Sequence, residues 1–179
     1  NESFTNYRHE SINKQSLSQN SIYDIYIDNQ SNIWLGTYFG GLNYVFRNPY
    51  NITTYSPTYN QKSKLNSEII SSIAESKDHI WIATEEEGIA KLNKNTLEIT
   101  PLTNLTKSNL IKDVYIKDDK LYIAQVGVGF SIYDINTNKI NHYSYDNSAN
   151  RSIEDVNRIF VDNHNNIYLS SFYGVLVSS

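Results

Sequence analysis

A short motif that returns four times along the chain constrains the fold more than any other feature. The first copy is Ile33-Trp34-Leu35-Gly36-Thr37, and the later copies occupy residues 80–84, 121–125 and 167–171. Counted from the aromatic residue, successive copies lie 47, 41 and 46 positions apart. A period of this size is typical of repeat proteins in which each repeat is one supersecondary unit.

Each motif lies among further runs that have the composition of β-strands. A run rich in β-branched residues precedes it, at residues 22–27, 69–73, 114–116 and 156–161. The connections contain Asp and Asn, which bond to nearby backbone N–H groups and tolerate positive φ, so we interpret them as hairpin turns. A glycine-containing turn and two more short runs follow the motif. Four antiparallel strands per repeat predict an all-β chain built of β-propeller blades.

We expect a single propeller domain over residues 1–179, with blades at about 21–59, 68–103, 110–146 and 154–179. The last blade has only three candidate strands, and Phe4-Thr5-Asn6-Tyr7 resembles the fourth, so an outer strand is expected within residues 1–10. Either this strand closes a four-bladed ring, or the chain is an open arc from a larger propeller of the seven-bladed type. We favour the arc, because four blades is the lower end of the usual range and no initiator methionine is present.

Composition excludes several classes of function. The formal charge of -4 argues against a charge-driven nucleic-acid binder, and the absence of cysteine excludes thiolate metal sites and thiol nucleophiles. The run Glu85-Glu86-Glu87 lies on one turn, which does not provide the opposed carboxylates of a glycosidase. The four histidines fall in different repeats, and no glycine-rich phosphate loop precedes a helix. We therefore predict no catalytic residue, no metal site and no cofactor.

The first repeat also resembles a known family. Asp28-x-x-Ser31-Asn32-Ile33-Trp34-Leu35-Gly36-Thr37-x-x-Gly40-Gly41-Leu42 is similar to the two-component regulator propeller repeat, with Ser31 in place of a glycine. Later copies depart further, since Tyr122 and Tyr168 replace the tryptophan.

The resemblance implies a role in signalling. Such propellers occur in the periplasmic sensor halves of hybrid histidine kinases, notably in glycan-degrading Bacteroidetes, and the parent protein would be anchored in the inner membrane. The chain is then expected to be a non-enzymatic, periplasmic sensing fragment that binds an oligosaccharide and relays the signal to a kinase outside these residues. It is expected to form a homodimer and to bind no nucleic acid. The alternative is a propeller scaffold for protein interaction or dimerisation without a small ligand.

The recurring aromatic residue and the turn after the motif indicate two different roles. The aromatic residue of each motif recurs at a fixed place, which indicates packing between blades rather than ligand binding. The turn after the motif varies among the repeats while its flanks stay alike, and its side of a propeller commonly carries the binding site. We therefore predict that the ligand contacts lie at this turn, at Tyr38, Phe39, Glu85, Glu86, Phe172 and Tyr173.

Overall fold

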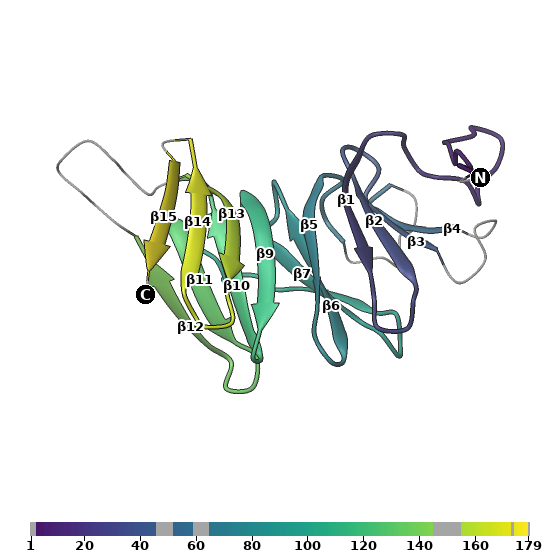
Figure 1. Cartoon of the computed structure of the whole chain (residues 1–179). Coiled ribbons are helices and arrows are strands. Elements are labelled where there is room, and N and C mark those ends of the chain that lie inside the picture. The colour runs from purple at the N-terminus through teal and green to yellow at the C-terminus, as the bar shows by residue number, and fades with distance from the viewer. Residues whose placement is uncertain (1–2, 46–51, 59–64, 145–154, 173, 179) are drawn as a thin grey trace.

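The computed structural model describes residues 3–45, 52–58, 65–144, 155–172 and 174–178. In these ranges the chain forms strands and no helix, which confirms the all-β prediction. The strands make three four-stranded sheets and one three-stranded sheet, each antiparallel and each formed by consecutive strands (Figure 1). The β-propeller blade is therefore the structural unit of the chain.

The strand bounds are as follows. The first sheet contains β1 (Ile22–Ile27), β2 (Ile33–Thr37), β3 (Leu42–Val45) and β4 (Ile52–Tyr55). The second contains β5 (Ile70–Glu75), β6 (His79–Thr84), β7 (Ile89–Asn93) and β8 (Ile99–Pro101). The third contains β9 (Ile111–Lys117), β10 (Lys120–Gln125), β11 (Gly129–Asp134) and β12 (Lys139–Tyr143). The fourth contains β13 (Val156–Val161), β14 (Ile167–Ser171) and β15 (Gly174–Ser178).

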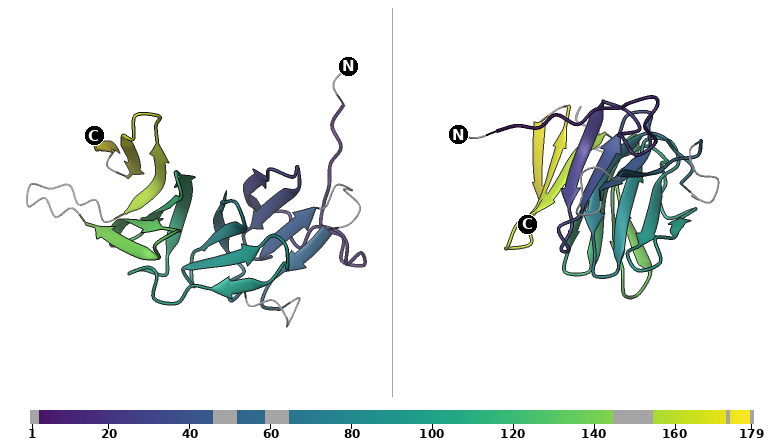
Figure 2. Two further views of the ribbon diagram at one scale, coloured as in Figure 1. Left: turned by 90° about the horizontal axis from the view of Figure 1, so that it is seen from below. Right: turned by 90° about the vertical axis from the view of Figure 1, so that its right-hand side faces the viewer.

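The four blades form an open arc. The first strand of each blade packs against the first strand of the next, in the order β1, β5, β9 and β13. The first and fourth blades lie at opposite ends of this arc, as Figure 1 and the left view of Figure 2 show.

The outer strand expected within residues 1–10 is not formed. Residues 3–10 have no strand structure, and the ring of Phe4 is almost fully exposed. The physical reason is distance, because the three-stranded blade that this segment would complete lies at the other end of the arc (Figure 1).

Aromatic side chains fill the spaces between blades. Trp34 is 1% exposed and packs with Ile73 and Ile82 of the second blade, and Trp81 is 2% exposed and packs with Val114 and Leu121 of the third. Tyr122 has the same place between the third and fourth blades. Burying such large rings supplies much of the stabilisation of a propeller. The prediction that the recurring aromatic residue packs between blades is confirmed for Trp34, Trp81 and Tyr122, whereas Tyr168 is half-buried in the last blade.

A β-bulge interrupts the first strand of every blade at the same position. In β1 the pairing with β2 skips one residue between Ile22 and Asp24, and equivalent shifts occur in β5, β9 and β13. A bulge leaves one residue without a partner and re-aims its side chain. The skipped residues are Tyr23, Ser71, Lys112 and Asn157.

The residue after the bulge links neighbouring blades. The carboxylate of Asp24 accepts the backbone N–H of Ile73 at 2.6 Å, and that of Asp113 accepts the N–H of Ile159 at 3.0 Å. The first strand of a blade is the edge of its sheet, so these N–H groups have no strand partner on that side, and leaving them buried without a partner would be costly.

Candidate functional site

The turns between the second and third strands of the blades have fixed ends. The Thr37 hydroxyl donates to the carbonyl of Gly41 at 2.8 Å, and the Thr84 hydroxyl donates to that of Gly88 at 3.0 Å. Gly41 has φ +73, and a Cβ there would lie 2.2 Å from the carbonyl oxygen of Tyr55. With the ends of the turn held in this way, the two residues after the threonine are free to vary. We call the side of the molecule that carries these turns the loop face.

In the first blade this turn carries an aromatic cluster, made of Tyr23, Tyr38 and Phe39. The ring centroids of Tyr23 and Tyr38 are 5.0 Å apart, and those of Tyr38 and Phe39 are 4.2 Å apart. Phe39 has φ 104, a conformation that costs a non-glycine residue roughly 1–3 kcal/mol. The surrounding contacts therefore hold exposed aromatic rings together on the loop face.

A cavity of about 340 Å³ opens beside this cluster, where the bulges of all four blades converge. Its lining includes the four skipped residues, Tyr23, Ser71, Lys112 and Asn157. It is completed by Glu85, Arg158 and the ring of Phe172, which is 81% exposed. The site thus draws on every blade, with an aromatic ring from each end of the arc and polar groups between them.

Each cation of the cavity has a carboxylate partner. The Lys112 ammonium lies 2.6 Å from Glu85, and the Arg158 guanidinium lies 3.4 Å from Asp113. Asp24 lies behind the cavity wall, and burial raises the pKa of its carboxyl although the N–H groups of Ile73 and Ile25 oppose this shift. The cavity thus combines two aromatic rings with charged groups that are paired with one another.

The six predicted contact residues fall into three groups. Glu85 and Phe172 line the cavity, and Tyr38 reaches it through its contact with Tyr23. Phe39 packs on Tyr38 instead, and Glu86 accepts a hydrogen bond from the hydroxyl of Ser67 at 3.3 Å, so neither is part of the lining. Tyr173 lies outside the described residues.

The four bulged residues and Arg158 are the lining residues that our sequence reasoning missed, although the sequence carries a signal for them. Strict alternation would place one residue between successive apolar residues on one face of the strand. Every repeat has two instead, as in Ile22-Tyr23-Asp24-Ile25 and Val156-Asn157-Arg158-Ile159. An extra polar residue at the same place in four strands is the pattern that a β-bulge produces.

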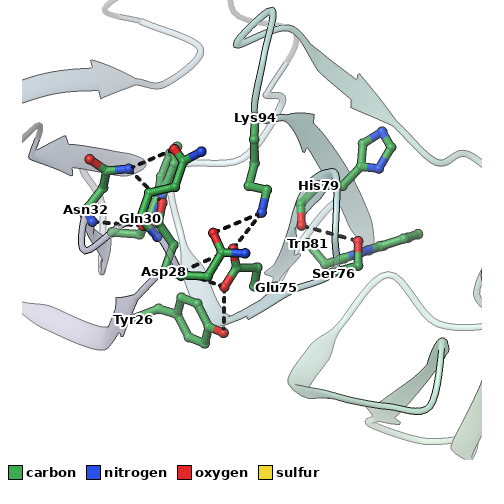
Figure 3. Close-up of polar contacts among 11 residues, drawn as sticks. Tyr26, Asp28, Gln30, Asn32, Glu75, Ser76, His79, Trp81 and Lys94 are labelled. Carbon is green, nitrogen blue, oxygen red and sulfur yellow. Dashed lines mark hydrogen bonds and ion pairs between the residues drawn. The ribbon is translucent and has the colours of Figure 1, made fainter.

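The opposite side of the blades, which we call the hairpin face, carries the turns between the first and second strands. Asp28 accepts hydrogen bonds from the backbone and side chain of Asn32 and from the indole N–H of Trp34 (Figure 3). Asp162 receives the equivalent bonds from Asn166 and from the Tyr168 hydroxyl. These aspartates hold the turn and the recurring aromatic residue together.

A second polar node on the hairpin face joins the first two blades. Glu75 binds the Lys94 ammonium at 2.6 Å, the backbone N–H of Asn29 at 3.0 Å and the Tyr26 hydroxyl at 3.4 Å (Figure 3). Burial, together with this carboxylate, raises the pKa of Tyr26 to about 12. The side chains of Lys94 and Glu75 are 7% and 10% exposed, so this ion pair is structural.

A cavity of about 390 Å³ also opens on the hairpin face. Glu75, Lys117 and Asp119 contribute to its wall, and no aromatic side chain does. Lys117 also contacts the turn of the fourth blade, where it donates to the carbonyl of Asp162 and the side chain of Asn165. Because exposed aromatic rings line the loop-face cavity and none lines this one, the loop-face cavity is the better candidate for a ligand.

Comparison with known proteins agrees with this fold. A profile of the family "Two component regulator propeller" matches residues 16–39. No curated protein sequence matches the chain. The extracellular domain of the hybrid two-component system BT3049 from B. thetaiotaomicron superposes with a TM-score of 0.80 at 23% identity, over 97% of this chain and 24% of that chain.

Two further structures extend the comparison. The extracellular domain of the hybrid two-component system BT4673 from the same bacterium gives a TM-score of 0.75 at 22% identity, over 92% of this chain and 22% of that one. PorZ, a surface component of the type-IX secretion system of Porphyromonas gingivalis, gives 0.68 at 12% identity, over 88% of this chain and 25% of that one. The chain thus spans about a quarter of the length of these proteins.

Within the described residues there is no helix with the length and apolarity that a membrane crossing requires. The matched segment includes β1, the Asp28 turn, β2 and the start of the loop-face turn, and the described residues share the fold of part of these extracellular domains. The chain is therefore an arc of β-propeller blades that matches the two-component regulator propeller family over residues 16–39 and resembles in fold the extracellular domains of Bacteroides hybrid two-component systems.

Proposed function

We propose that this chain is part of a periplasmic sensor domain that binds an oligosaccharide in the loop-face cavity and relays the signal to a histidine kinase. The observation that carries the proposal is the convergence of all four blades on one cavity, with exposed rings of Tyr23 and Phe172 at its two ends. Sugars present apolar C–H faces that stack on aromatic rings and hydroxyl edges that bond to polar side chains. The cavity offers both kinds of contact. The role that we propose for it is binding, without catalysis.

The arc gives such a ligand a way to act at a distance. A molecule that contacts the first and fourth blades together binds best at one spacing between them, and so stabilises one curvature of the arc. It shifts an equilibrium between two arrangements only by the difference in its affinity for them. We therefore propose that a change in the curvature of the arc is relayed toward the membrane.

Calorimetric titration of the chain with a panel of tetrasaccharides of glucose, xylose, arabinose, mannose and galacturonic acid tests the proposal. We expect saturable binding of at least one member, and about tenfold weaker binding after Phe172→Ala because a stacking contact is lost. Phe4→Ala is the matched control, since Phe4 is 94% exposed and lies outside the cavity. A folded chain that binds no member of the panel, or a Phe172→Ala variant that binds as tightly as Phe4→Ala, would contradict the proposal.

A second candidate, an interaction scaffold, is favoured by the two ends of the arc. The first blade exposes Ile25, Ile27 and Ile33, and the last exposes Val175 and Val177. The two faces are of complementary kinds. Ile73 and Ile80 of the second blade occupy the positions equivalent to Ile25 and Ile33, and they pack against the preceding blade. The occupant that we propose is a second copy of the chain, docked first blade to last.

Sedimentation velocity distinguishes this scaffold. We expect a concentration-dependent dimer that is lost in both Ile27→Lys and Val177→Lys. An equal mixture of the two variants retains one intact pair of faces and is expected to regain dimer, because the contact is head-to-tail. A wild-type chain that stays monomeric at about 0.1 mM, or a mixture that stays monomeric, rules the scaffold out.

A further inference from the structure

The four bulged residues of the inner strands form a set with an unusual property. Tyr23, Ser71, Lys112 and Asn157 are the residues that the strand pairing skips, and all four line the loop-face cavity. They occupy one equivalent position of the repeat, yet they carry a phenol, a hydroxyl, an ammonium and an amide group.

The apolar residues on either side of each bulge are uniform by comparison. The residue before each bulge is Ile or Val and is half-buried or buried, and the residue two places after it is Ile or Val. A skipped residue takes no part in the ladder of hydrogen bonds, so its side chain is not constrained by pairing. Ser71 is 6% exposed and donates its hydroxyl to the carbonyl of Ile111 at 2.7 Å, so it also holds two blades together. At Tyr23, Lys112 and Asn157 the identity of the residue can change the chemistry of the cavity while the blade around it stays intact.

Resting on the proposed function, we propose that the bulged residues Tyr23, Lys112 and Asn157 select the ligand and that the selected class is an uncharged oligosaccharide. The charges of the site support the second part. Lys112 and Arg158 face Glu85 and Asp113, and Asp24 stands behind them, which makes three carboxylates against two cations. Asp113 also receives the Ser72 hydroxyl and the Ile159 N–H, so it stays in place when a ligand enters.

A carboxylate on a sugar would therefore meet no free cation among the described residues that line the cavity. To bind Lys112 it would have to displace Glu85 from a 2.6 Å ion pair, and near Arg158 it would approach Asp113. A neutral sugar avoids both costs, because its hydroxyl groups can donate to Glu85 and accept from Asn157 while the ion pairs remain.

Matched neutral and acidic sugars test the charge preference. The chain would be titrated with tetragalacturonate and its methyl ester, and with cellotetraose and its uronic acid counterpart. We expect the neutral member of a pair to bind about tenfold more tightly, which corresponds to about 1.4 kcal/mol. In Glu85→Gln, Lys112 loses its carboxylate partner, so we expect the ratio of neutral-sugar to acidic-sugar affinity to become smaller or to reverse. Glu98→Gln, an exposed position outside the cavity, is expected to keep it.

The role of the bulged residues is tested with the tightest neutral sugar and its epimers. Tyr23→Ala and Asn157→Ala are expected to change the ratio of affinities among epimers by about fivefold or more, whereas Asn141→Ala on the exposed outer strand β12 leaves it unchanged. Equal ratios in all variants, or tighter binding of the acidic member by the wild type, overturn this inference while the proposed sensor function stands. A folded chain that binds no sugar at all overturns both.

Discussion

The two sides of this molecule use the repeat in opposite ways. On the hairpin face the same side chain does the same work in more than one blade, since Asp28 and Asp162 both bind a downstream asparagine and the recurring aromatic residue. On the loop face the equivalent position differs in every blade, and the four different side chains meet at one cavity. The comparison teaches that repeated residues in this chain hold the turns and the blades in place, whereas the variable ones at shared positions supply the candidate site.

The largest expected effect comes from removing a repeated aromatic residue. We expect Trp81→Ala to lower the free energy of unfolding by about 3–5 kcal/mol, because it empties the space between the second and third blades. Urea denaturation followed by circular dichroism measures this change. Tyr38→Ala on the loop face is the matched variant, with an expected loss below about 1 kcal/mol. Equal losses in the two variants would break the distinction between the faces.

The next test compares the two lysine ion pairs. Lys94→Ala leaves the carboxylate of Glu75 buried without its cation, so we expect a loss of about 3 kcal/mol. Lys112 and Glu85 are 32% and 20% exposed, and Lys112→Ala is expected to cost less than about 1 kcal/mol. Thermal unfolding of both variants decides the order, and a larger effect for Lys112→Ala would show that the loop-face pair is the structural one.

The hairpin-face aspartates predict how stability depends on pH. Burial raises the pKa of Asp28, but hydrogen bonds from Asn32 and Trp34 outweigh it and hold that pKa below its usual range. Hydrogen bonds from Asn166 lower the pKa of Asp162 to about 2. In both cases the folded state favours the ionised form, so their contribution is complete above the unfolded value near 4 and is lost as the pH falls towards 2.

Denaturant midpoints measured between pH 5 and pH 2 check this expectation. The slope of stability against pH is expected to be smaller in Asp162→Asn than in the wild type. Burial raises the pKa of Asp24, so this carboxyl favours the folded state more as the pH falls. Asp24→Asn removes that contribution, and the loss of stability with falling pH is expected to become steeper. Identical slopes in the wild type and in Asp162→Asn would contradict the assignment of Asp162 as a turn-holding carboxylate.

The smallest expected effect concerns the exposed ring of the cavity. Phe172→Ala is expected to change the free energy of unfolding by less than about 0.5 kcal/mol, because the ring is largely in solvent. A fluorescence-monitored urea titration measures it. A loss above about 1 kcal/mol would mean that Phe172 packs for stability, and this would weaken its assignment to a ligand site.

The fold was predictable because its signals are local. Period-two runs of β-branched residues, Asp and Asn in the turns and one aromatic residue per repeat each indicate a blade without reference to any distant contact. The outer strand expected near Phe4 failed for the opposite reason. Four residues of suitable composition do not form a strand unless an unpaired edge lies within reach, and the open arc places that edge at the far end of the molecule.

The candidate site was only partly predictable. Glu85 and Phe172 were found because their turn varies between repeats, and both line the cavity. Phe39 and Glu86 share those turns but point to other partners, which a pattern of residue types does not determine. The bulged residues were present in the sequence as an extra polar residue per strand, but their significance depends on where four separate strands aim their side chains.

The sequence by itself determined the blades, their order, the turn chemistry of Asp28 and the burial of Trp34 and Trp81, since each follows from residues close together in the chain. The tertiary structure alone decided that the arc stays open between the first and fourth blades, and that Tyr23, Ser71, Lys112 and Asn157 meet although up to 134 positions separate them. The physical reason is that strand pairing is encoded within each hairpin, whereas the convergence of bulges arises from the packing angle between whole blades, to which many buried contacts contribute together.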